Sequence, residues 1–357
     1  MRHLYLQNIS MVVIIVFVSL FLALAAKGYP LDIQDEAGLS RQKAIVFDRP
    51  DPEGVPTKIS IGLFLLDLIS IDDVDQSFTA DFYAVVRWND PRLSIADPTE
   101  AQMIRVFDID EIWHPLTYVI NQRRMTRQLD NVFRVDSAGN VQYVQRFSGE
   151  FSSPLDLKNF PLDKQNLALQ VVSFRYGPEE VEFVLDQQRT GQRDTLSLVG
   201  WSKGQLQPEI TTEYLRIQDR HLARIDFKLE VKRQRPYYII KALVPLFLII
   251  FMAWSVFFID PSVIGPQIGI PTSSVFALIL FNHRISALLP RVSYLTRIDR
   301  FILFSIILVF ITLGESVVTA TLAQKEKKEL ALKIDRWARY LYLLLFAAVF
   351  VYSFVLK

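Results

Sequence analysis

The chain has 357 residues, a net charge of +1 and 51% hydrophobic residues. The near-zero charge gives no support to bulk nucleic-acid binding, and the hydrophobic content is high for a protein that lies wholly in water. Cysteine is absent, which excludes disulfides, thiolate metal ligands and a cysteine nucleophile. The length suggests about two domains.

The first 26 residues contain an apolar run that ends in small residues, among them Ala25 and Ala26. This order predicts a secretory signal peptide over residues 1–26, cleaved near those two alanines. The alternative is a retained transmembrane helix, because the run is nearly long enough to span a bilayer. A polar segment with several prolines follows over residues 27–57 and is interpreted as a lead-in to the next domain.

Residues 58–235 contain several short runs in which apolar and polar side chains alternate. Residues 78–88 and 225–231 are the clearest of these runs. An alternation of period two indicates a strand with one face on a core. Turn-forming clusters such as residues 137–140 separate the runs, and no helical period intervenes. The pattern predicts an antiparallel, immunoglobulin-like β-sandwich.

Residues 236–357 predict an all-α transmembrane domain of four helices in a multi-pass protein of the cell membrane. The apolar segments lie at about 239–259, 267–289, 301–322 and 340–356. The first and third are long enough to span a bilayer with few charges, and the fourth is apolar on all sides.

The loop between the third and fourth segments is rich in lysine and arginine, which favours a cytoplasmic position. The flanks that would then lie outside are basic too, so charge alone leaves the orientation open. The predicted signal peptide favours an N-terminal domain in the periplasm or outside the cell.

The second apolar segment is more polar than its neighbours. Steps of four and three residues place six side chains on one helical stripe: Gly269, Ser273, Phe276, Leu280, His283 and Ala287. Several copies around an axis would line a water-filled pore, with Phe276 and Leu280 as a hydrophobic constriction that gates by dewetting. The alternative is a bundle helix whose hydroxyl groups bond to neighbouring helices.

The sequence contains no phosphate loop, metal-ligand spacing or nucleophile motif, and its four histidines are scattered. We therefore expect no catalytic residue, no metal and no cofactor. A membrane-anchored enzyme and a binding receptor that does not conduct ions are the two alternatives to a channel.

Residues 153–167, with Phe160-Pro161-Leu162-Asp163 at their centre, resemble the signature loop of the pentameric ligand-gated ion channels, the Cys-loop receptor superfamily. Cysteines bracket this loop in animal members, whereas Ser153 and Leu167 stand at those positions here. The pattern is therefore similar to the cysteine-free bacterial branch. Further resemblances lie at residues 88–93, 112–115, 267–275 and 289–294.

This resemblance implies a homopentamer in a lipid bilayer that conducts inorganic ions. A small-molecule agonist or a proton would act on the outer domain, at the interfaces between subunits. The resemblance also implies an aromatic cage for cationic ligands through cation–π attraction. The cage candidates are Trp113, Tyr118, Phe174, Tyr176 and Tyr214.

The resemblance further implies a junction that couples ligand binding to the pore, centred on Arg233. The expected coupling residues are Asp72, Asp73, Phe160, Pro161, Leu162, Asp163, Arg233, Pro290 and Tyr294. The alternative is a solvated surface ion pair of little energetic consequence. Ion selectivity stays open, because Gly265 and Pro266 occupy the place of the acidic residue of cation channels.

Overall fold

The computed structural model describes residues 48–95 and 104–355. The predicted signal peptide and most of the lead-in segment lie outside the described residues. The chain forms two compact units, of which the larger comprises Pro50–Ile109 and Pro115–Lys357. The described residues of the smaller unit are Asp48, Arg49 and Asp110–His114. All strands and helices discussed below belong to the larger unit.

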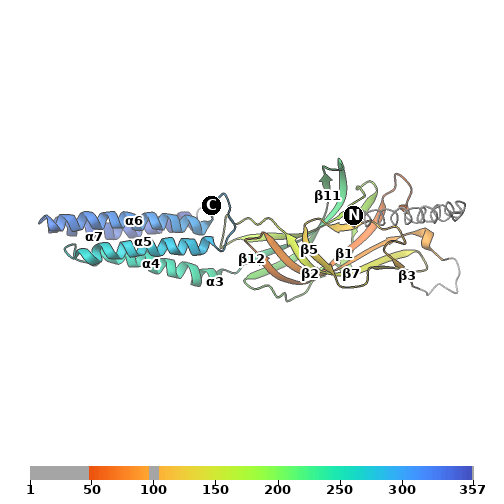
Figure 1. Cartoon of the computed structure of the whole chain (residues 1–357), viewed down its shortest axis with the longest axis horizontal. Helices are drawn as coiled ribbons and strands as arrows, with labels where there is room; N and C mark the ends of the chain where they lie inside the picture. The colour runs from red at the N-terminus through yellow and green to blue at the C-terminus, as the bar shows by residue number, and fades with distance from the viewer. Residues whose placement is uncertain (1–47, 96–103, 356–357) are drawn as a thin grey trace, which may run out of the picture. The chain divides into compact units, whose positions relative to one another are not determined.

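The N-terminal domain is a sandwich of two β-sheets (Figure 1). The first sheet has the order β10-β1-β2-β7-β6-β3, with β5 also paired to β7 and β9 to β1. The second has the order β11-β12-β8-β4. The strands are β1 (Thr57–Asp72), β2 (Ser77–Asn89), β3 (Arg105–Asp108), β4 (Thr117–Val119), β5 (Gln122–Arg127), β6 (Val132–Val135), β7 (Asn140–Ser152), β8 (Lys164–Ser173), β9 (Val181–Leu185), β10 (Gly191–Gln192), β11 (Trp201–Leu215) and β12 (Arg220–Arg233).

The predicted β-sandwich is confirmed, but it is not purely antiparallel. Strands β9 and β10 both pair with β1 in parallel, with Thr57 opposite Val181 and Phe64 opposite Gly191. After β8 the chain leaves the second sheet and returns to the edge of the first, where it runs in the direction of β1. Alternation of side chains indicates a strand but not the direction of the strand that pairs with it. The sequence pattern therefore could not distinguish parallel from antiparallel pairing.

The alternating strands build the core in the expected way. Phe151 of β7 is fully buried and lies against Phe78 and Phe82 of β2, with ring centroids 5.4 and 5.9 Å away. At one end of this sheet the turn before β7 contains Gly139 at a φ of +79°, where a Cβ would lie 2.3 Å from the Asp90 carbonyl oxygen. A residue at this position must adopt a positive φ and has no room for a Cβ, so only glycine fits this turn.

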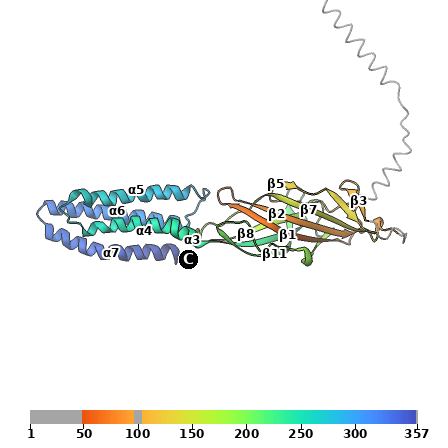
Figure 2. The same ribbon diagram turned by 90° about the horizontal axis from the view of Figure 1, so that it is seen from below.

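Four helical segments of the described chain are long and apolar enough to cross a membrane. The first, Arg235–Phe258, is composite and contains a π-helical turn. Helices α4 to α7 lie side by side in Figures 1 and 2. The helical elements are α3 (Arg235–Tyr238), the π-turn η3 (Ile239–Leu243), α4 (Val244–Trp254), the 3₁₀ turn η4 (Ser255–Phe258), α5 (Ile264–Ser286), α6 (Arg297–Gln324) and α7 (Lys328–Phe354).

The fourth membrane helix differs most from its predicted bounds, because α7 begins at Lys328 rather than near residue 340. The first turns of α7 carry many charged side chains, so they did not belong to the apolar run from which this helix was predicted. They nevertheless bury Ala331 and Asp335, so one face of this segment packs as a helix should. Farther along, Phe247 of α4 contacts Phe346 and Phe350 of α7 and Phe301 of α6, with centroids 5.6 to 5.9 Å apart.

Replacing Phe151 by alanine tests the core. The Phe151→Ala change is expected to lower the free energy of unfolding by about 3–5 kcal/mol, because it leaves a cavity between the two sheets. Phe174→Ala is the matched control: this ring is 48% exposed, and its loss should cost less than about 1 kcal/mol. Denaturant unfolding of the detergent-solubilised chain measures both. Equal losses would contradict this assignment of the core.

Candidate ligand, coupling and pore sites

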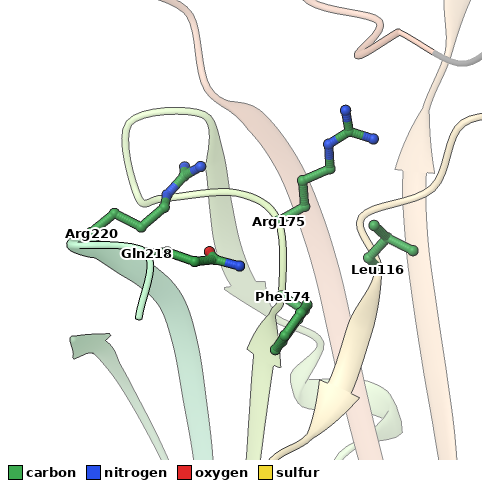
Figure 3. A pocket seen from close by; sticks show the side chains of 5 residues that line it. All are labelled: Leu116, Phe174, Arg175, Gln218 and Arg220. Carbon is green, nitrogen blue, oxygen red and sulfur yellow. The ribbon is translucent and has the colours of Figure 1, made fainter. Parts of the chain in front are cut away.

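A surface pocket of about 570 Å³ lies where three segments of the N-terminal domain meet (Figure 3). Leu116 precedes β4, Phe174 and Arg175 follow β8, and Gln218 and Arg220 come from the turn into β12. The pairing of β4 with β8 continues into this region, where the Phe174 amide donates to the Leu116 carbonyl oxygen over 3.1 Å. Backbone pairing thus fixes one side of the pocket.

Two of the five predicted cage residues lie together beside this pocket. The rings of Tyr118 and Phe174 are 6.2 Å apart and about half exposed. Tyr214 is also exposed, but its hydroxyl donates to the Asp219 carboxylate over 2.6 Å. That bond raises the pKa of Tyr214. An exposed aromatic pair therefore exists in one subunit, whereas a closed cage does not.

The other two predicted cage residues are buried. Tyr176 is 9% exposed, and Trp113, in the smaller unit, is 2% exposed. Aromatic side chains in a β-domain are more often core than surface, and sequence position alone does not separate the two cases.

The pocket also carries positive charge that the sequence analysis missed. Arg175 and Arg220 are among its lining residues, and Arg220 pairs with Glu180 at 2.5 Å. In the sequence Arg175 follows Phe174, but nothing there links Arg220 to these two residues. The surface therefore offers donors for an anionic or neutral polar group as well as an aromatic face.

Arg233, at the end of β12, is the centre of a buried charge cluster. Its side chain is 2% exposed and makes two-pronged ion pairs with Asp163 and with Asp73. Burial alone would lower the pKa of Arg233, but hydrogen bonds and charge from the two aspartates reverse the effect and raise it. Arg233 is therefore permanently charged and compensated by two carboxylates, unlike a solvated surface pair.

Two aromatic rings pack against the Arg233 guanidinium. The Arg233 guanidinium carbon lies 4.0 Å from the Trp201 ring centre and 4.8 Å from that of Phe160. Phe160 in turn packs edge-on against Tyr238 of α3, with centroids 5.2 Å apart. The loop of residues 153–167 thus contacts the start of the first membrane helix through Phe160.

The same loop bonds directly to the connection between α5 and α6. The Leu157 amide donates to the Tyr294 hydroxyl over 3.1 Å, and the Arg297 amide donates to the Lys158 carbonyl oxygen over 3.1 Å. Inside the loop, the Gln165 amide group donates to both the Asp156 carbonyl oxygen and the Asp163 carboxylate. These bonds hold the shape that cysteines would otherwise constrain.

Several predicted coupling residues have other contacts. Asp72 accepts hydrogen bonds from the Val74 and Asp75 amides, so it stabilises the turn after β1. Its neighbour Asp73 is the residue of this turn that pairs with Arg233. Pro161 is buried and Leu162 half-buried within the loop. Pro290 accepts a hydrogen bond from the Val292 amide in the α5–α6 connection.

Helix α5 has one exposed and one buried face in the subunit. All six residues of the predicted stripe are exposed, Phe276 at 63% and Leu280 at 70%. The opposite face is buried and comprises Gln267, Pro271, Ser274, Leu278 and Ile285. The helix continues through Pro271, and the Ser274 hydroxyl donates to the Ile270 carbonyl oxygen nearby. The polar and bulky apolar groups of the stripe are thus free to face a water-filled axis.

Asp260, in the connection before α5, is the nearest acid to the start of that helix. It is paired with Lys328 at 2.6 Å, and this bond together with the Ser262 amide lowers its pKa to about 2. Its charge at neutral pH is therefore partly compensated, and the residue does not act as a bare negative ring.

Removing the charge of Arg233 tests the cluster. Arg233→Gln is expected to lower the free energy of unfolding by about 3–5 kcal/mol, because Asp73 and Asp163 lose their counter-charge in a buried setting. Arg146→Gln is the control, because the ion pair of Arg146 with Asp81 is partly exposed and its loss should cost about 0–1 kcal/mol. Thermal unfolding compares the two. Adding Asp163→Asn should recover part of the first loss, and similar losses in the two single variants would contradict the assignment.

Comparison with known proteins assigns the two domains. The sequence matches the neurotransmitter-gated ion-channel ligand binding domain over residues 46–235 and the neurotransmitter-gated ion-channel transmembrane region over residues 242–343. A proton-gated ion channel of Gloeobacter violaceus is 25% identical over 285 residues, which cover 80% of this chain and 79% of the relative. Ion channels of this kind are not a class of enzyme. The chain therefore belongs to the neurotransmitter-gated ion-channel family, as a cysteine-free member with the function of a ligand-gated ion channel.

Proposed function

We propose that five copies of this chain form a homopentameric channel that opens on acidification, with α5 from each subunit lining the pore. The exposed stripe on α5 is the observation that carries this proposal. On this stripe the polar side chains of Ser273 and His283 are exposed on the same face as Phe276, and polar groups of a membrane helix face water or protein rather than lipid. The stripe is small and hydroxylic at one end and polar at the other, as a pore lining requires.

The constriction lies at Phe276 and Leu280, one helical turn apart. In five copies these side chains form two successive apolar rings. Water leaves a narrow apolar passage, and ions cannot cross without their hydration shell. Tilting or rotating α5 would widen both rings together, since both belong to one helix.

The cluster around Arg233 connects ligand binding to that movement. Arg233 ends β12 and precedes α3, so it joins the second sheet directly to the first membrane helix. Its partner Asp163 lies in the loop that bonds to the connection between α5 and α6. A movement of the two β-sheets therefore moves α3 and α5 as well, without a flexible linker between them.

Protons are the proposed agonist because the Gloeobacter violaceus relative is described as proton-gated. The pocket beside Phe174 is the proposed site for a small-molecule ligand, completed by an adjacent subunit. Its two arginines favour a ligand with an anionic group, in addition to the aromatic contact expected from the sequence.

The N-terminal domain is proposed to lie in the periplasm or outside the cell, with the short α6–α7 turn in the cytoplasm. Lys325, Lys327 and Lys328 at that turn support this orientation. The predicted signal peptide agrees with it.

Current recordings from purified protein in a planar bilayer test the proposed function. A step from neutral to acidic pH on the side of the N-terminal domain should open a current, and ion substitution then gives its selectivity. If the current requires an added small molecule, that molecule rather than the proton is the agonist. The absence of current under a pH series and a ligand panel would favour the receptor that does not conduct.

Truncating the proposed constriction tests the pore assignment. Phe276→Ala should raise the current at neutral pH by roughly tenfold, which corresponds to ~1.4 kcal/mol in the equilibrium between closed and open states. Phe310→Ala is the matched control, because Phe310 of α6 is equally exposed but lies outside the stripe. Channel recordings should show an unchanged closed state for this control. Equal effects of both substitutions would count against α5 as the pore helix.

A further inference from the structure

Two carboxylic side chains meet inside the transmembrane domain, away from the sites described above. Glu315 of α6 and Asp335 of α7 lie within hydrogen-bonding reach of each other. Asp335 is 2% exposed, and all four carboxylate oxygens of the pair are shielded from solvent. Acidic side chains in such a setting are costly and mark functional positions in membrane proteins.

The pair lacks hydrogen-bond donors in its ionised form. Within the described residues, no donor reaches any of the four carboxylate oxygens. The one nearby hydroxyl, that of Thr319, lies beside Asp335 but also 3.2 Å from the Glu315 and Ser316 carbonyl oxygens, so its single hydrogen is shared among several acceptors. Two buried carboxylates at hydrogen-bonding distance repel each other unless a proton lies between them.

The surrounding charges compensate the pair only in part. Arg339, one turn along α7, faces Asp335, but one of its terminal nitrogens donates to the Phe257 carbonyl oxygen and its guanidinium carbon lies 3.8 Å from the Phe258 ring centre. Asp260, after η4, adds a further negative charge and is itself paired with Lys328. From α5 the facing group is the uncharged amide of Gln267.

We propose that Glu315 and Asp335 form a proton-binding site that holds one shared proton per subunit at neutral pH and joins α6 to α7. With the proton in place, one carboxyl donates to the other, and the pair forms a hydrogen bond across the two helices. Without it, two negative charges face each other in a buried space and push the helices apart. The ligand of this site is thus the proton itself.

The site also reaches the pore helix. The Gln267 side chain of α5 is fully buried and donates to the Thr319 hydroxyl over 3.4 Å, while its carbonyl oxygen has no donor among the described residues. Ser316, on the same stretch of α6, has an equally buried hydroxyl without a partner. A change of charge at the pair therefore acts on a polar contact of α5. This link to opening rests on the proposed function, whereas the proton site itself does not.

Infrared difference spectroscopy of the purified, lipid-reconstituted full chain tests the proton site without recording current. The wild type should show the C=O stretching band of a protonated, buried carboxylic acid at neutral pH. Glu315→Gln and Asp335→Asn each leave a single carboxyl. Each should therefore remove the band or change its frequency, and the affected intensity should correspond to about one carboxyl per subunit. Glu329→Gln, at an exposed acid in the first turn of α7, is the control and should leave the band unchanged.

The possible outcomes distinguish the proton site from the proposed function. A wild type without such a band at neutral pH overturns the proposal, and so does a band that neither substitution changes. Both substitutions nearly preserve side-chain shape, and each is sufficient alone if the other fails to assemble. A protein that shows the band but passes no current would keep the proton site and reject the proposed function.

Discussion

A buried guanidinium joins the two domains of this protein. Arg233 is compensated by Asp73 and Asp163, which come from two different loops, and it is enclosed by Trp201 and Phe160. A buried ion pair of this kind gives little net stability, but each member becomes costly as soon as one partner leaves. The turn after β1, the loop of residues 153–167, the end of β12 and the start of α3 are therefore compelled to move together.

This constraint explains how the loop keeps its form without cysteines. A disulfide restricts the unfolded chain, whereas here the folded chain is held by contacts at several points. Gln165 ties the loop internally, Asp163 ties it to Arg233, and Leu157 and Lys158 tie it to the α5–α6 connection. The loop is thus held by hydrogen bonds and one ion pair, each of which can break and re-form, whereas a covalent bridge cannot do so without a redox reaction.

Much of the architecture was predictable from the sequence, because alternation and apolar length follow directly from burial on one face or on all sides. The exposed stripe on α5 was predictable for the same reason, from helical spacing alone. Properties that depend on partners distant in sequence were not predictable: the parallel pairing of β9 and β10 with β1, the arginines of the pocket, and the meeting of Glu315 with Asp335. Tyr176 and Trp113 show the same limit, because spacing cannot tell a buried ring from an exposed one.

The π-turn at Ile239–Leu243 lies between the Arg233 cluster and the straight part of the first membrane helix. A π-turn holds one residue more than an α-turn, and its backbone bonds skip five residues rather than four. Compared with a continuous α-helix, the extra residue rotates the preceding segment by about 100° relative to α4, because each α-helical residue turns the chain by that angle. The π-turn therefore sets the angle about the helix axis at which Tyr238 meets Phe160, independently of the face that α4 presents to the other membrane helices.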